Sequence, residues 1–298
     1  MDIDKLKGII IPMITPFRNG TLDRESLEKI VDFASRIGAK GVFPGSSTGC
    51  FPLMSFDEQA ALISDVSNMI KGNLAFIPGV GRNSVSETVE MARRSENAGA
   101  DAVVVVTPYY IKMNDISLLN YFDKIASALG SMSIIMYSIP QLTGNNISPD
   151  VAFKIAEKHK NVIGVKDSSG DFRNMAGFLA RKPEDFLVFQ GQDDLLLQSL
   201  KLGADGGVCG TANFTALPAE IYKAYTNGDY GKALEMQNKL TGLMKLLSNF
   251  SFPVGFNFLF SKVMYGNDTV GMIPPIASLN EREGAQLYEE ANKFLQIL

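Results

Sequence analysis

One lysine stands where a buried strand would end. Lys166 follows the apolar run 162–165 and precedes Asp167-Ser168-Ser169-Gly170, a stretch typical of a loop. An amine at such a boundary is poorly hydrated, which favours its neutral, nucleophilic form. Lysines in that form attack carbonyl substrates and give Schiff bases. The same position would also suit a lysine that extends from a strand end to water.

A tyrosine ends another apolar run and could assist this amine. Tyr137 closes the run 133–137 and precedes Ser138-Ile139-Pro140. If both strand ends meet in one place, the phenol could pass protons while a carbinolamine forms and loses water. Taken alone, Tyr137 also fits the edge of a hydrophobic core, where its hydroxyl would reach a polar partner.

A short loop of small residues could hold an acid group. Gly45-Ser46-Ser47-Thr48-Gly49 follows a third apolar run, and its main-chain N–H groups and hydroxyls could bind a carboxylate. Ser47, Thr48 and Gly49 are therefore candidate substrate-binding residues, although such clusters also form plain turns. No Gly-Lys-Ser/Thr follows, so the loop is not a nucleotide-binding P-loop.

Polar and small residues follow the remaining runs and could line the far end of the same site. The candidates are Ser168, Gly191, Asp193, Gly210 and Thr211. Asp193 could accept hydrogen bonds from sugar hydroxyls, or it could cap a helix. We expect the two cysteines, Cys50 and Cys209, to be buried as small apolar groups.

Several other chemistries are excluded by composition. The single histidine, His159, lies in a charged stretch where we expect a solvated helix end, and no Cys-x-x-Cys is present. Neither a metal site nor a histidine-assisted nucleophile is expected. A net charge of −4 without a basic run disfavours nucleic acid. Two cysteines are too few for a disulfide framework in a chain of this size, which predicts a protein of the reducing cytoplasm. No membrane span or secretion signal is visible, so no membrane partner is expected.

The elements that would position these residues alternate between strands and helices. Short, nearly continuous apolar runs predict eight strands buried on both faces, at 8–14, 41–43, 74–78, 102–106, 133–137, 162–165, 186–189 and 206–208. Helical patterns with capping residues lie between them, for example at 23–37, 55–70 and 84–97, and several end at a glycine: Gly38, Gly72, Gly99, Gly130 and Gly203.

Eight such units predict an α/β fold, a (β/α)8 TIM barrel, whose strand ends converge on one mouth. Although 298 residues could make two ordinary domains, one barrel accounts for most of them. We expect a catalytic barrel over residues 1–225. Helical periodicity at 230–247, 255–265 and 281–298 then predicts a C-terminal helical extension, residues 226–298, packed on the barrel.

These motifs together resemble the pyruvate-dependent class I aldolases, the family that includes dihydrodipicolinate synthase, N-acetylneuraminate lyase and 2-keto-3-deoxygluconate aldolase. The resemblance covers essentially the whole chain. It rests on Pro12-Met13-Ile14-Thr15-Pro16-Phe17, Ser47-Thr48-Gly49, Thr107-Pro108-Tyr109-Tyr110, Tyr137-Ser138-Ile139-Pro140 with Thr143-Gly144, Gly164-Val165-Lys166, Gly203-Ala204-Asp205-Gly206-Gly207 and Pro274-Pro275-Ile276.

The resemblance implies roles for particular residues. Lys166 would be the Schiff-base lysine, Tyr137 the proton shuttle, and Ser47 and Thr48 the carboxylate binders. Tyr110 would be lent to the site of a neighbouring subunit. The family's usual assembly implies a homotetramer.

Departures from the family's patterns bear on the substrate. Leu142 stands where the synthase places an arginine for its second substrate, which disfavours lysine biosynthesis. Cys50 stands where the synthase and the neuraminate lyase usually place glutamate, and the loop that follows is more similar to that of archaeal 2-keto-3-deoxygluconate aldolases. Other features, including Leu142 and the pair Asp193-Asp194, are similar to the neuraminate lyase.

The leading hypothesis is a carbon–carbon lyase that reversibly cleaves 2-keto-3-deoxygluconate to pyruvate and glyceraldehyde. Its partners would be a small keto acid and an aldehyde. In this hypothesis Ser47 would also act in catalysis by orienting Tyr137. No metal or organic cofactor would be needed, because the Schiff base forms on Lys166. N-acetylneuraminate lyase is the nearest alternative, followed by a keto-deoxy sugar acid dehydratase or dihydrodipicolinate synthase. A barrel that binds keto acids without turnover is a further alternative of a different class.

Overall fold

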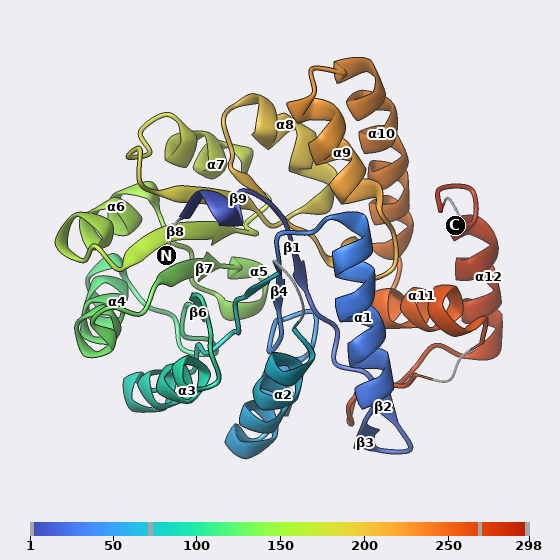
Figure 1. Ribbon diagram of the computed structural model, residues 1–298, viewed down its shortest axis with the longest axis horizontal. Helices are drawn as coiled ribbons and strands as arrows, with labels where there is room; N and C mark the ends of the chain where they lie inside the picture. Colours follow the sequence, from blue (N-terminus) through green and yellow to red (C-terminus); the bar gives the residue numbers. More distant parts are fainter. Residues whose placement is uncertain (1–2, 71–73, 268–269, 296–298) are drawn as a thin grey trace.

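The computed structural model describes residues 3–70, 74–267 and 270–295, and it shows a parallel β-barrel surrounded by helices (Figure 1). Eight parallel strands lie in the spatial order β5-β4-β1-β10-β9-β8-β7-β6. A parallel bridge between Gly79, three residues after β5, and Val104 of β6 closes the ring. The predicted TIM barrel is confirmed.

All eight expected strands are present, two of them, at 41–43 and 206–208, with the predicted ends and the others with shifted ends. They are β1 (Gly8–Pro12), β4 (Gly41–Phe43), β5 (Ala75–Phe76), β6 (Val103–Val106), β7 (Ile134–Ser138), β8 (Val162–Asp167), β9 (Leu187–Gln190) and β10 (Gly206–Val208). The sequence analysis missed a small hairpin, β2 (Phe17–Arg18) with β3 (Thr21–Leu22). Two-residue strands are too short to show the period-two pattern by which strands are recognised.

Helices cover the outside of the barrel. They are α1 (Arg24–Ile37), α2 (Phe56–Met69), α3 (Val85–Asn97), α4 (Asp115–Leu129), α6 (Pro149–Lys158), α7 (Phe172–Leu179), α8 (Leu196–Lys201) and α9 (Leu217–Thr226). The short helix α5 (Pro140–Thr143) lies instead at the carboxyl end of β7 (Figure 1). Asp23, Ser55 and Ser84 cap α1, α2 and α3 as their sequence patterns predict, and Ser55 forms a full capping box with Glu58. The predicted stop at Gly72 lies outside the described residues.

Three further helices follow the barrel: α10 (Tyr230–Leu247), α11 (Val254–Tyr265) and α12 (Glu281–Ala291). The buried amide of Gln237 ties α10 to the end of β9. It accepts from Leu197 N at 2.8 Å and donates to Asp193 O at 3.1 Å. Across the described ranges, none of the helices combines the length and apolar character that crossing a membrane would need.

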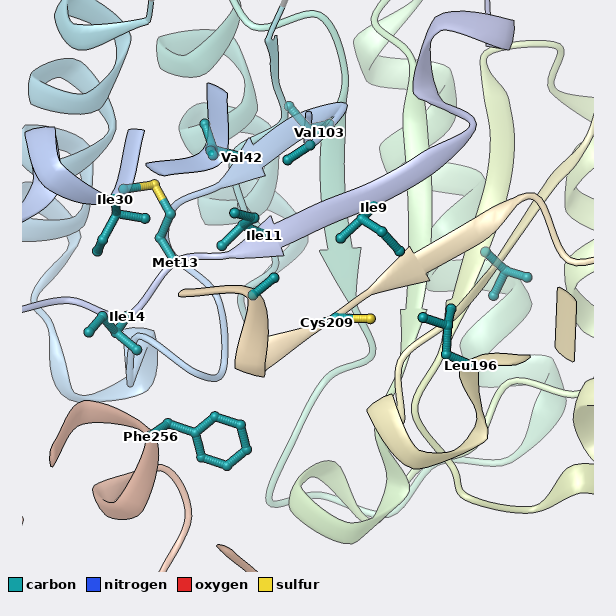
Figure 2. Close-up of a cluster of buried hydrophobic side chains, with 14 of the residues drawn as sticks. Ile9, Ile11, Met13, Ile14, Ile30, Val42, Val103, Leu196, Cys209 and Phe256 are labelled. Carbon is teal, nitrogen blue, oxygen red and sulfur yellow. The ribbon is translucent and has the colours of Figure 1, made fainter. Parts of the chain in front are cut away.

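Two hydrophobic cores divide the buried side chains. The larger core lies between the strands and the surrounding helices, and Figure 2 shows Ile9 and Ile11 of β1 in this layer with Ile30 of α1. The smaller core fills the barrel and includes Phe43, Tyr137 and Phe189. Alternate residues of each strand therefore enter different cores, as the period of two requires.

Strand β8 breaks this alternation at one point. Ile134 pairs with Val162, but Ile135 pairs with Gly164, so Ile163 is an extra residue in β8. Val162 points to the larger core, between the strands and the helices. In a regular strand Lys166, four residues later, would point to the same side and so away from the barrel. The extra residue moves every later side chain to the other face and turns Lys166 into the barrel. Bulges commonly redirect a side chain in this way beside an active site.

Gly164 is required where the bulge meets β9. A Cβ on this residue would lie 2.5 Å from Leu187 O, closer than real contacts allow. We expect Gly164→Ala to lower the free energy of unfolding by about 1–3 kcal/mol, because the two strands must separate. Urea denaturation followed by circular dichroism measures this change.

A matched control is Gly231→Ala in α10. Gly231 is exposed and a Cβ there meets only Asp229 Oδ1 at 3.9 Å, so stability should stay equal or rise by up to about 1 kcal/mol. Equal unfolding midpoints for Gly164→Ala and the unaltered protein would contradict the close approach at the bulge.

Candidate active site

Lys166 and Tyr137 are neighbours on adjacent strands inside the barrel. They are direct partners in the register of β7 and β8. The Lys166 amine lies 3.9 Å from the centroid of the Tyr137 ring and 5.3 Å from that of Phe43. Lys166 is 3% exposed and forms no ion pair within the described residues. An amine held among rings without an anionic partner is placed to react with a carbonyl.

The amine opens into a cavity of about 320 Å³ at the carboxyl ends of the strands. Its walls come from Pro12, Thr48, Tyr137, Ile139, Gln141, Leu142, Lys166, Ser168, Gly191, Gln192, Asp193, Val208, Gly210, Met244, Leu247, Ser248, Phe250, Ser251, Phe252 and Phe256. Lys166 is the single cationic side chain of this lining. The cavity therefore has one basic side chain, at its base.

The loop after β4 presents unpaired polar groups beside the cavity. Within the described residues, the main-chain N–H groups of Ser47 and Thr48 have no protein acceptor, and neither hydroxyl has a hydrogen-bond partner. Thr48 lines the cavity, while Ser47 lines a small void with Tyr137 beneath it. The loop can therefore donate to an acid group, although no hydrogen bond joins Ser47 to Tyr137 here. Gly49 is packed too closely for a side chain, since a Cβ would lie 2.8 Å from Met13 O.

Ser168 and Gly191 lie beside the lysine. The Ser168 hydroxyl is buried and has no hydrogen-bond partner. A Cβ on Gly191 would collide with this hydroxyl and would lie 3.0 Å from Lys166 Cε. The glycine thus leaves room for both groups. Ser168 lines the cavity as a residue, while its hydroxyl is buried behind that surface.

Asp193, Gly210 and Thr211 are close together, but in an arrangement that differs from the expected contact with sugar hydroxyls. The Asp193 carboxylate is 3% exposed and accepts from Gly210 N at 3.1 Å, Thr211 N at 2.9 Å and Thr211 Oγ1 at 2.5 Å. Burial raises the pKa of Asp193, while these donors oppose the rise. The carboxylate therefore holds the loop after β10, and Thr211 is buried beneath that loop.

Tyr110 lies outside the cavity of its own chain. It is 93% exposed and has a φ of 72°, a left-handed conformation that turns the loop after β6 outward. No contact of Tyr110 with Lys166 or Tyr137 exists within this chain. The role that the family resemblance implies would need a second copy, and it stays a prediction.

The sequence analysis missed two parts of the cavity. One is an apolar wall from α10, α11 and the segment between them, including Met244, Phe252 and Phe256. Nothing in the local sequence indicates that these residues reach the mouth of the barrel. The other is a pair of glutamines, Gln141 and Gln192, which stand beside motif residues but carry no titratable group.

His159 differs from the solvated residue expected. It ends α6 as predicted, but its side chain is 12% exposed and its Nε2 lies 2.6 Å from Asp123 Oδ1. Among the described residues, no group of three or more His, Cys, Asp or Glu side chains is arranged to hold a metal ion.

Both cysteine thiols are buried near the mouth of the barrel. Burial raises the pKa of Cys50 to about 11 and that of Cys209 well above its usual range. Because only a thiolate is alkylated quickly, about one Cys50 thiol in a thousand should be reactive at pH 8. We expect the native protein to resist iodoacetamide at pH 8 and labelling of Cys50 to rise about tenfold per pH unit towards pH 11.

Mass spectrometry of the labelled protein measures this reaction. The protein unfolded in urea serves as the control, in which both thiols should label rapidly. Fast labelling of native Cys50 at pH 7 would contradict the burial seen here.

The chain is similar to known proteins over most of its length. The sequence profile of the Dihydrodipicolinate synthetase family matches residues 5–293. A 2-dehydro-3-deoxy-D-gluconate/2-dehydro-3-deoxy-phosphogluconate aldolase from Picrophilus torridus is 36% identical over 265 residues, which are 89% of this chain and 97% of the relative. A 4-hydroxy-tetrahydrodipicolinate synthase from Methanopyrus kandleri is 34% identical, with 97% of each chain covered.

A solved structure gives the same result for the fold. The 2-keto 3-deoxygluconate aldolase from Picrophilus torridus superposes with a TM-score of 0.87 at 36% identity, covering 92% of this chain and 98% of the other. The family match spans nearly the whole chain, including the barrel and the helices that follow it. The chain therefore belongs to the dihydrodipicolinate synthetase family.

Proposed function

We propose that the protein is a Schiff-base aldolase that reversibly cleaves 2-keto-3-deoxygluconate to pyruvate and glyceraldehyde. The observation that carries this proposal is the buried amine of Lys166, unpaired and 3.9 Å from the Tyr137 ring at the base of the cavity. Such an amine can form an imine with a 2-keto acid and needs no metal or organic cofactor.

The reaction begins at the ketone of the substrate. The nitrogen lone pair of Lys166 adds to C2, and the carbinolamine loses its hydroxyl as water to give an iminium. Loss of the proton from the C4 hydroxyl then lets the C3–C4 bond break, and its electron pair moves into the iminium as an enamine. Glyceraldehyde leaves, the enamine is protonated at C3, and hydrolysis of the imine releases pyruvate.

The remaining residues have supporting roles in this mechanism. Tyr137 carries protons between the carbinolamine, water and the C4 hydroxyl. The free N–H groups and hydroxyls of Ser47 and Thr48 hold the substrate carboxylate, with Gly49 keeping the loop tight. Ser168 and Gly191 line the cavity beside Lys166, and Gly191 leaves the space that the lysine and Ser168 side chains occupy.

The lining of the cavity favours a free sugar acid over a substrate with a second anion. Lys166 is the single basic residue in this lining, and its nitrogen would be bonded to C2 of the substrate in the imine. A phosphate or a second carboxylate would therefore be buried without a partner, which is costly. Leu142 lies in the wall as an uncharged residue, which argues against the synthase reaction named for the Methanopyrus kandleri relative.

The proposed assembly is a homotetramer in which Tyr110 enters the site of a neighbouring copy. Its 93% exposure in the single chain leaves the ring available for such a contact. This part of the proposal is independent of the imine chemistry.

Pyruvate with borohydride tests the central step. Reduction should add one reduced pyruvyl group at Lys166, because hydride converts the imine to a stable amine, and peptide mapping locates it. Lys166→Ala should abolish both labelling and turnover, whereas Lys201→Ala, at an exposed helix end, should retain both. Labelling elsewhere or wild-type turnover by Lys166→Ala would disprove the mechanism.

Tyr137→Phe separates proton transfer from binding. The variant keeps the ring beside Lys166 but lacks the hydroxyl, so kcat for cleavage should fall by about 10²–10⁴-fold. KM should change little, since the carboxylate site after β4 is intact. Steady-state kinetics measures both values, and an unchanged kcat would remove Tyr137 from the reaction.

A further inference from the structure

Two glutamines are fixed to the same loop at the rim of the cavity. The Nε2 atoms of Gln141 and Gln192 both donate to Ser168 O, at 3.0 Å and 2.8 Å, and Gln141 also donates to Ser169 O at 2.6 Å. A carbonyl oxygen can only accept, so each amide must turn its nitrogen to the loop. The orientation of both side chains is thereby determined.

The loop that holds these amides is itself anchored. Asp167 accepts from Ser169 N at 2.9 Å and from Asn174 Nδ2 at 3.0 Å. At Gly170, with a φ of 72°, a Cβ would lie within 4.0 Å of both amide nitrogens. The two amides therefore pack against a tight turn and need little ordering when a ligand binds.

Both amide oxygens remain available. Within the described residues, the Oε1 atoms of Gln141 and Gln192 have no hydrogen-bond donor, and both side chains line the cavity. This side of the cavity thus offers neutral groups that can bind hydroxyls.

The opposite side of the cavity has a different character. Met244, Phe252 and Phe256 make it apolar, and among the lining residues no cation other than Lys166 balances an anion. A short chain with hydroxyls on one edge and C–H groups on the other matches both walls. An anionic chain end would face amide oxygens, which repel it.

We propose that Gln141 and Gln192 are specificity-determining residues that recognise hydroxyl groups on the aldehyde half of the substrate. The inference rests on the proposed aldolase function. It assigns the aldehyde partner to a class, the uncharged hydroxylated aldehydes, and it makes the two amide oxygens the groups that select this class.

The test compares two aldehydes of equal chain length in aldol addition to pyruvate: glyceraldehyde, and propanal, which lacks the hydroxyls. The variants are Gln141→Met and Gln192→Met, which keep side-chain length but remove the amide. The control is Gln286→Met, at an exposed position on α12. The measured quantity is kcat/KM for each aldehyde, together with borohydride trapping of pyruvate.

For each variant at the rim, kcat/KM for glyceraldehyde should fall by about three- to tenfold, the effect of one lost neutral hydrogen bond. The value for propanal and the trapping of pyruvate should stay within about twofold, because neither uses the amides. The Gln286→Met protein should match the unaltered enzyme with both aldehydes.

Other results would overturn the inference. An equal fall for both aldehydes would show that the glutamines only hold the loop, and no fall would show that they do not contact the substrate. A higher kcat/KM of the unaltered enzyme for propanal than for glyceraldehyde would show that the apolar wall, and not the amides, selects the aldehyde. Failure to trap pyruvate on Lys166 would instead overturn the proposed function, and with it this inference.

Discussion

The extra residue in β8 is the constraint on which the site depends. In a strand buried on both faces, side chains alternate between the barrel interior and the layer under the helices. The extra residue Ile163 exchanges the two faces for the residues that follow it. Lys166 therefore enters the barrel beside Tyr137. The shift is possible because Gly164 lets the backbone of β9 approach closely. A single amine is thereby placed among rings, where its hydration is poor.

The carboxylates of Asp193 and Asp167 are buried near the mouth, where they hold the surrounding loops in place. Because they are buried, they present little negative charge to the cavity. Asp193 accepts three hydrogen bonds from the loop after β10, and Asp167 accepts from the loop after β8. Because their oxygens are occupied by main-chain and neighbouring donors, these acids position the rim. The groups left to meet a ligand are neutral, apart from the lysine, which suits chemistry in which the iminium is the electron sink.

The cavity combines parts that are far apart in the sequence. Lys166 and Tyr137 at its base come from β8 and β7, the loop with unpaired N–H groups follows β4, and the apolar wall comes from the helices after the barrel. Gln237 joins α10 to the segment after β9 by bonding both Leu197 and Asp193. The extension therefore supplies one wall of the cavity, and α10 is held against the barrel beside it.

The sequence alone determined the barrel, its eight strands and the position of Lys166 at a strand end, because burial on both faces leaves continuous apolar runs and helix caps leave local signals. It could not show the bulge, since Ile163 and Gly164 fit an apolar run in either register. Nor could it separate the structural role of Asp193 from ligand binding, or bring Phe256 and the two glutamines into the wall. Those features depend on contacts between distant segments, and only tertiary packing decides which polar atoms are left without a partner.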